Sequence, residues 1–187
     1  MIVNDGADTD ANWDIVEAYI GNSADYQYFY FRVNLAGTGI LPSNGDALEA
    51  RLDCDRNGFF TDAVDVTVFY AKDFFSIPSE QIIECQGNDY PGCSGANSDW
   101  NLESFGEEIS GPPSEYEWST DTINGNTNWS QCLGTVDVQF ASINPDVGPP
   151  VDLTATLPYN APNSVTLSNI IGNSPLAAPI TGIVIGL

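Results

Sequence analysis

The strongest constraint on the fold is a strict alternation of residue character over residues 26–35, where Phe29, Phe31 and Val33 share one face and Tyr28 and Tyr30 share the other. Successive side chains of a β-strand point to opposite faces, so this alternation predicts a sheet strand. The same period of two predicts further strands over residues 15–20, 47–53, 64–70, 135–141 and 153–157. No segment has a sustained helical period.

Turn-forming residues separate the predicted strands at Ser43-Asn44-Gly45-Asp46, at Asn57-Gly58 and at Asn124-Gly125-Asn126. Asn and Gly tolerate the positive φ that tight turns require. Many short strands with such turns predict an all-β fold, which we expect to be an antiparallel, jelly-roll-like β-sandwich over residues 1–145. Residues 85–113, where the alternation weakens, are expected to form one long excursion at an end of the sandwich.

Residues 146–187 differ in composition and predict an extension rich in Pro, Asn and Ser that ends in an apolar strand. No acidic residue follows Asp152, and residues 180–187 are uncharged and rich in β-branched side chains. Such a segment can add as a strand to an open sheet edge. If the edge belongs to the same molecule, the segment is simply the last strand. If the edge belongs to a neighbour, subunits link head to tail into a filament.

The charge of the chain excludes several classes of function. Acidic residues outnumber Lys and Arg by 26 to 4, for a formal net charge of -22, so phosphate backbones and anionic lipid surfaces would repel the chain. No apolar run reaches the roughly 18–20 residues of a membrane span. The chain has no His, the usual general base, and we therefore expect no enzymatic activity. In so acidic a chain, a carboxylate pair such as Glu115 and Glu117 carries little weight as a glycosidase signal.

The most specific motif has the Asp-x-Asp-x-Asn-Gly spacing of calcium loops and begins at Asp53. Side-chain oxygens at every second position of a tightly turning backbone can converge on a hard cation, and Gly58 permits the turn. Val64 occupies the position where an EF-hand has its Glu, and the flanks predict strands, so a helical EF-hand is excluded. The alternative is an acidic β-turn without metal. The candidate calcium ligands are Asp53, Asp55, Asn57, the Phe59 carbonyl, Asp62 and Asp65.

A second acidic cluster lies near the N-terminus and is a possible second metal site. Its candidate ligands are Asp5, Asp8, Asp10 and Asp14. The alternative for these side chains is solvated charge, which is usual for acidic residues on a surface.

Four cysteines in a loop-rich β sequence fit two disulfides, which form outside the cytosol, and we expect an extracellular or cell-surface location. Three pairings are possible. Cys85 with Cys93 would close a short loop and leave Cys54 to pair with Cys132. Four buried free thiols are the alternative. Asn128 begins an acceptor sequence for N-glycosylation, which fits export.

Aromatic side chains supply the candidates for ligand stacking. Trp100 and Trp129 lie outside the strand patterns and are the surface candidates, whereas Trp13 and Trp118 lie in strand-like patterns and are expected in the core. The stripe formed by Tyr26, Tyr28, Tyr30 and Arg32 can contact sugars or a protein partner if it is exposed, and it is core if a second layer covers it.

The first 70 or so residues resemble a known grouping of domains, the calcium-loop β-sandwich modules of prokaryotic cell-surface proteins, which includes DOMON-like and family 9 carbohydrate-binding domains. The resemblance rests on the segments NWDIVEAYIGNSADYQYFYFRVNLAG and LEARLDCDRNGFFTDAVDVTVFY. It implies a non-catalytic β-sandwich that binds sugars, haem or other proteins. The usual haem ligands are missing, because the chain has no His and Met1 is its only Met.

These observations lead to one expectation with one alternative. We expect a calcium-stabilised structural or adhesive subunit of an extracellular surface, which associates with itself or with other surface proteins through β-strand addition. The alternative is a carbohydrate-binding module whose partners are glycans. Sugar binding rests on an analogy of fold alone.

Overall fold

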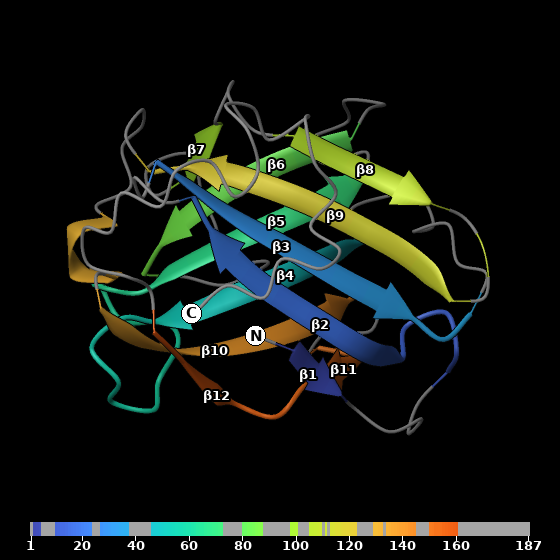
Figure 1. Ribbon diagram of the computed structural model, residues 1–187, viewed down its shortest axis with the longest axis horizontal. Helices are drawn as coiled ribbons and strands as arrows, with labels where there is room; N and C mark the ends of the chain where they lie inside the picture. Colours follow the sequence, from blue (N-terminus) through green and yellow to red (C-terminus); the bar gives the residue numbers. More distant parts are fainter. Residues whose placement is uncertain are drawn as a thin grey trace.

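Two antiparallel β-sheets pack face to face in the computed structural model of the protein (Figure 1). The structure describes residues 2–4, 10–23, 27–37, 46–72, 80–87, 98–100, 105–109, 111, 113–122, 129–132, 134–144 and 150–160. The described regular structure is β-strand apart from one short 3-10 turn, η2 (Trp129–Cys132). The predicted antiparallel β-sandwich is therefore confirmed. None of the described elements is a helix with the length and apolar character needed to cross a membrane.

The smaller sheet has five strands and lies toward the viewer in Figure 1. Their spatial order is β1 (Ile2–Asn4), β2 (Ile15–Asn22), β3 (Tyr28–Leu35), β9 (Ser114–Asp121) and β8 (Phe105–Ile109). The larger sheet has seven strands behind it. Their order is β11 (Asp152–Leu153), β10 (Thr135–Ile143), β4 (Ala47–Asp53), β5 (Val66–Lys72), β6 (Glu80–Gln86) and β7 (Ser98–Trp100), with β12 (Leu157–Asn160) also paired to β10.

Two pairings between strands that are distant in the sequence join the halves of the chain. β3 pairs with β9, which places Phe31 opposite Trp118. β4 pairs with β10, which places Ala50 opposite Phe140. Because β3 and β4 follow one another in the chain but lie in different sheets, these two pairings bring the C-terminal half against both sheets at once.

Aromatic side chains fill the space between the sheets. Phe31 of β3 is fully buried, and its ring lies 5.6 Å from that of Trp118 and 6.4 Å from that of Phe140. Trp118 also contacts Tyr70 of β5, with ring centroids 6.0 Å apart. Tilted and edge-to-face ring contacts add to the free energy of burial. The face of β3 predicted from alternation to be apolar is therefore the core face, and the expected core position of Trp118 is confirmed.

Each strand predicted between residues 15 and 141 overlaps a strand of the structure, whereas β1, β6 and β9 lie outside the predicted segments. The strands predicted over 26–35 and 64–70 are β3 and β5, and each begins two residues later than predicted. The strand predicted over 47–53 has the bounds of β4, and those predicted over 15–20 and 135–141 extend by two residues as β2 and β10. The expected excursion over 85–113 instead contains β7 and β8. The strand predicted over 153–157 is two separate strands, β11 and β12, because the intervening residues 154–156 do not pair.

Part of the region predicted as an extension belongs to the larger sheet. β11 and β12 both pair with β10, and Tyr159 of β12 is buried against the core. The Tyr159 hydroxyl donates a hydrogen bond to Asn22 Oδ1 of β2, and Asp152 Oδ2 accepts one from the backbone of Ile15 at 2.8 Å. The sandwich thus continues at least to Asn160. Residues 161–187, which include the predicted terminal strand, lie outside the described residues.

We predict that Phe31→Ala lowers the free energy of unfolding by about 3–5 kcal/mol, because it leaves a cavity between the sheets. Chemical denaturation monitored by tryptophan fluorescence measures the change. Leu153→Ala is the control, since Leu153 is 42% exposed in an edge strand and its loss should cost no more than about 0.5 kcal/mol. Equal effects of the two substitutions would contradict the assignment of Phe31 to the centre of the core.

Candidate metal centre

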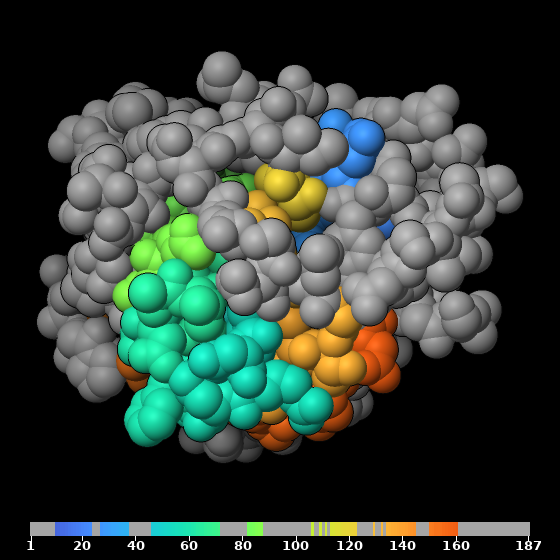
Figure 2. Space-filling model, turned by 90° about the vertical axis from the view of Figure 1, so that its left-hand side faces the viewer, coloured from blue at the N-terminus to red at the C-terminus, as the bar shows by residue number. Residues whose placement is uncertain are grey.

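The predicted calcium loop is the connection between β4 and β5, at one end of the larger sheet (Figure 1). In Figure 2 this part of the chain forms a continuous cyan surface that faces the viewer. Residues 55–59 are exposed, whereas Asp53 and Asp65 at the two ends of the loop are buried. The loop therefore has a buried base, formed by its first and last carboxylates, and an exposed tip.

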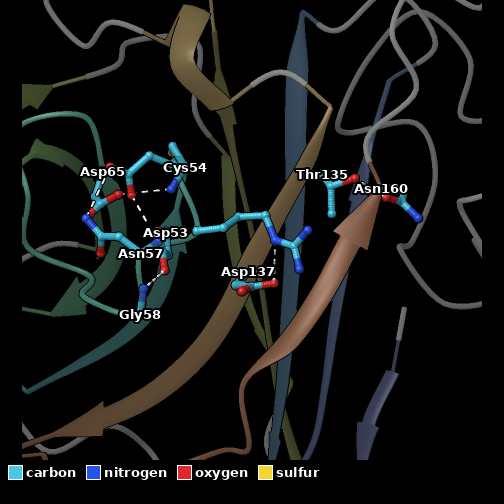
Figure 3. A network of polar contacts seen from close by, with 10 residues as sticks. Asp53, Cys54, Asn57, Gly58, Asp65, Thr135, Asp137 and Asn160 are labelled. Carbon is cyan, nitrogen blue, oxygen red and sulfur yellow. Dashed lines mark hydrogen bonds and ion pairs between the residues drawn. The ribbon is translucent and has the colours of Figure 1, made fainter.

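The two buried carboxylates organise the loop backbone (Figure 3). Asp53 accepts hydrogen bonds from the backbone N–H groups of Asn57, at 3.1 Å, and Gly58, at 2.7 Å. Asp65 accepts them from the backbone N–H groups of Cys54 and Asp62, each at 2.9 Å. A buried carboxylate requires such partners, because burial removes it from water. Asp53 thus shapes the first half of the loop, and Asp65 ties its end to its beginning.

Two left-handed residues give the loop its curvature. Gly58 has φ of 88°, which a glycine adopts at no steric cost, so the turn predicted at this position is confirmed. Arg56 has φ of 60°, which is uncommon for a residue with a side chain. Its guanidinium Nε lies 3.2 Å from Asp137 Oδ1 of β10, so an ion pair supports this conformation.

Three carboxylates converge at the base of the loop. Asp53, Asp55 and Asp65 each offer an oxygen within 4.8 Å of the others. Burial raises the pKa of Asp65 to about 6, and the charges of Asp53 and Asp55 add to this rise against the hydrogen bonds from Cys54 and Asp62. Like charges this close favour protonation or a bound cation. Carboxylate oxygens are the ligands that hard cations such as Ca²⁺ prefer, so the donor set fits calcium.

The other predicted side-chain ligands, Asn57 and Asp62, lie beside this cluster and are bonded to it or to each other. The Asn57 amide nitrogen donates to Asp55 Oδ2 at 3.1 Å and to Asp62 Oδ2, while its oxygen accepts from the Phe59 backbone at 2.8 Å. If the Asn57 side-chain amide rotated by half a turn, its oxygen would take the place of its nitrogen. The oxygen could then be a ligand of a cation. Asp62 is exposed and contacts the cluster through Asn57. The Phe59 side chain is 67% exposed at the loop tip.

Of the second acidic cluster the structure describes Asp10 and Asp14, and the possible metal site there stays a prediction. Asp10 is exposed and accepts a hydrogen bond from the backbone of Asn12 at 3.0 Å, whereas Asp14 is buried. Asp5 and Asp8 lie outside the described residues. Within the described part of the chain, the group of Asp53, Asp55 and Asp65 is the one whose acidic side chains lie close enough to share a metal ion.

The predicted long-range disulfide is present. Cys54 and Cys132, 78 residues apart in the sequence, are bonded, with Cα atoms 4.5 Å apart. Cys85 is also disulfide-bonded. Its predicted partner Cys93 lies outside the described residues, as does the glycosylation candidate Asn128.

Trp129 is a correction to the predicted stacking sites. It is only 5% exposed, because η2 turns its ring into the core, where it stacks on Phe29 with centroids 5.1 Å apart. Its indole N–H donates to Glu84 Oε2 at 3.3 Å. Trp129 therefore offers no surface for a sugar. The side chain of Trp100 in β7 lies outside what the structure describes.

Sequence reasoning missed a buried ionic cluster on the outer face of the smaller sheet. Arg32 lies 2.9 Å from Glu115 and 3.7 Å from Glu117, and its guanidinium carbon is 5.0 Å from the centre of the Tyr19 ring. Arg32 and Tyr30 are 5% and 3% exposed, so the second half of the predicted tyrosine stripe is buried. The alternation pattern of each strand predicts which face Arg32, Glu115 and Glu117 occupy. The pairing of β3 with β9 is what makes Arg32 a neighbour of the two glutamates.

Comparison of the chain with protein-family models, with curated proteins and with solved structures gave no match. The resemblance to calcium-loop surface modules therefore stays a hypothesis.

The pKa of Asp65 predicts a pH dependence of stability in the metal-free protein. Its folded-state value of about 6 exceeds the ordinary value of 3.8, so the unfolded state releases this proton first as the pH rises. We predict that the wild type in chelator loses stability relative to Asp65→Asn as the pH rises from 4 to 6. The difference between the two free energies of unfolding, wild type minus variant, therefore decreases over this range. Urea denaturation of both proteins at several pH values measures this difference. If this difference increased with pH, the result would contradict the raised pKa of Asp65.

Proposed function

We propose that this protein is a non-catalytic extracellular structural or adhesive subunit that is stabilised by calcium at the loop of residues 53–65. The observation that carries the proposal is the convergence of Asp53, Asp55 and Asp65 at the base of that loop.

Calcium is the cation that best suits the cluster. Three carboxylates with oxygens within 4.8 Å of one another carry a local negative charge, and the whole chain has a formal net charge of -22. Calcium accepts six to eight oxygen ligands with flexible geometry, so backbone carbonyls, Asn57 and water can complete the shell. Zinc and copper favour His and Cys ligands, and the chain has no His.

The disulfides support an extracellular location. Cys54–Cys132 and the disulfide of Cys85 are of the kind that persists in oxidising compartments, whereas cytosolic thiols are kept reduced. Extracellular calcium is abundant enough to fill weak sites of this type, whose dissociation constants are about 0.1–1 mM. The two features therefore favour the same compartment.

The edge strands of the sandwich support a structural or adhesive role. Among the described strands, β1 and β8 end the smaller sheet and β7 and β11 end the path of the larger sheet, and an edge strand is where another strand can add. The uncharged segment over residues 180–187 has the composition of an added strand. We propose that subunits associate through such an addition, with themselves or with other surface proteins.

A carbohydrate-binding module is the alternative, and one observation favours it. Tyr28, on the outer face of the smaller sheet, is half-buried, whereas its neighbour Tyr30, whose ring lies 6.3 Å away, is buried. A partly exposed aromatic side chain such as Tyr28 can contact the apolar face of a sugar. The burial of Trp129 removes one of the two tryptophans on which this alternative depended.

We predict that calcium raises the unfolding temperature of the purified, oxidised protein and that Asp55→Asn removes most of this rise. Asp55 is exposed, so its substitution removes a ligand without disturbing the core. A ligand at one hundred times its dissociation constant stabilises the folded state by about 2.7 kcal/mol. Calorimetry with calcium and with chelator makes the measurement, and Glu115→Gln, which removes a carboxylate of β9 outside both acidic clusters, is the matched control. An equal rise in unfolding temperature with calcium in the wild type and in Asp55→Asn would contradict calcium binding at this loop.

Self-association is tested by light scattering and negative-stain microscopy of the full chain in calcium. We predict ordered oligomers or filaments that are lost when residues 176–187 are deleted, because the deletion removes the proposed added strand. The matched control replaces the same residues by a Gly/Ser segment of equal length. A wild-type monomer at all concentrations would reject assembly, and saturable binding to a glycan would then favour the carbohydrate-binding alternative.

A further inference from the structure

The Cys54–Cys132 disulfide lies within the candidate metal centre. Cys54 directly follows β4 and stands between Asp53 and Asp55, two of the three converging carboxylates. Cys132 ends η2, three residues before β10 begins. Cys54 and Cys132 are 7% and 0% exposed, and both belong to the main hydrophobic core. A dissolved thiol therefore reaches this bond only when the loop opens.

The backbone of Cys54 is bonded to the carboxylate that closes the loop. Its N–H donates to Asp65 Oδ1 at 2.9 Å, and Asp65 Oδ2 accepts from Asp62 at 2.9 Å (Figure 3). The disulfide tethers this same residue to η2, and Asp53 on the other side of it lies opposite Asp137 of β10. The position of the sulfur bridge and the position of the carboxylates are thus set by one short stretch of backbone.

The other side of the loop is held by the turn after β6. The Gly87 N–H donates to the Asp65 carbonyl oxygen at 3.0 Å, and a Cβ at Gly87 would lie 3.1 Å from Ala63 Cα. Gly87 has φ of 70° and stands two residues after the disulfide-bonded Cys85. The end of the loop therefore packs closely against the turn after β6, which the disulfide of Cys85 restrains. The loop end has little room to shift unless the loop opens.

We propose that the Cys54–Cys132 disulfide and the bound cation protect each other. The bond holds Cys54 and, through it, Asp53, Asp55 and Asp65 in the arrangement that a cation requires. The cation neutralises the repulsion that would otherwise open the loop and expose the bond. This inference rests on the proposed binding of calcium. Because coupling between two equilibria is reciprocal, reduction weakens cation binding by the same factor by which the cation disfavours reduction.

The chemical step is thiol–disulfide exchange with a dithiol. A dithiothreitol thiolate attacks one sulfur, the Sγ–Sγ bond breaks, and a mixed disulfide forms. The second thiol of the reagent, as its thiolate, attacks this mixed disulfide and releases the protein cysteine. The protein bond takes up two electrons and two protons to give the thiols of Cys54 and Cys132, and dithiothreitol is oxidised to its cyclic disulfide.

The first experiment follows the reduction of the oxidised full chain by dithiothreitol, with timed alkylation and mass spectrometry of Cys54 and Cys132. We expect calcium to slow the reduction about tenfold relative to chelator, because a bound cation lowers the fraction of molecules whose loop is open. Asp55→Asn should lose this protection, and Glu115→Gln, which removes a carboxylate of β9 outside both acidic clusters, should keep it. Equal reduction rates of the wild type with calcium and with chelator would overturn the inference.

The second experiment compares calcium binding by calorimetry to the oxidised wild type and to the double variant Cys54→Ser, Cys132→Ser, with circular dichroism as the check on folding. We expect about tenfold weaker binding to the double variant. Equal affinities, or an unfolded variant together with equal reduction rates in the first experiment, overturn the inference while the proposed function stands. Absence of calcium binding to the oxidised wild type overturns the proposed function and the inference with it.

Discussion

Phe31 lies where the two sheets meet, in contact with Trp118 of its own sheet and Phe140 of the other. This packing depends on the pairing of β3 with β9 and of β4 with β10, which brings together parts of the chain that are far apart in the sequence. Burial of large aromatic rings supplies the favourable free energy that offsets the entropy lost in closing such long loops. The position of β4, and so of the loop that follows it, is a consequence of this packing.

At the base of the candidate metal centre, closely spaced carboxylates lie at the rim of the hydrophobic core. Asp53 and Asp65 are buried because β4 and β5 bring their ends together at the rim of the core. Their hydrogen bonds from the loop backbone compensate part of the lost hydration, and the raised pKa of Asp65 reflects the part that remains. A cation would compensate the rest. Metal binding and folding would then be coupled, because the unfolded chain does not assemble the ligands.

On the smaller sheet, buried charges are balanced by ion pairs between side chains. Arg32 forms ion pairs with Glu115 and Glu117 and lies over the ring of Tyr19, so these charges are balanced by side chains of neighbouring strands. In the loop of the candidate metal centre, the described basic residue Arg56 pairs with Asp137 on β10 and not with Asp53, Asp55 or Asp65. With only four basic residues in the chain, most carboxylates have no such partner. This shortage is the physical reason why an external cation suits the protein.

The sequence by itself determined the all-β class, most strands of the first half, the turn at Gly58 and the spacing of the calcium-type loop. These features are local, because side-chain alternation, glycine conformation and ligand spacing act within a few residues. The tertiary structure decided which predicted ligands converge, namely Asp53, Asp55 and Asp65 without Asp62, and it turned Trp129 inward against Phe29. It also joined Arg32 to Glu115 and Glu117, and paired β11 and β12 with β10. Each of these outcomes depends on contacts between strands far apart in the chain, and local patterns do not encode which strands become neighbours.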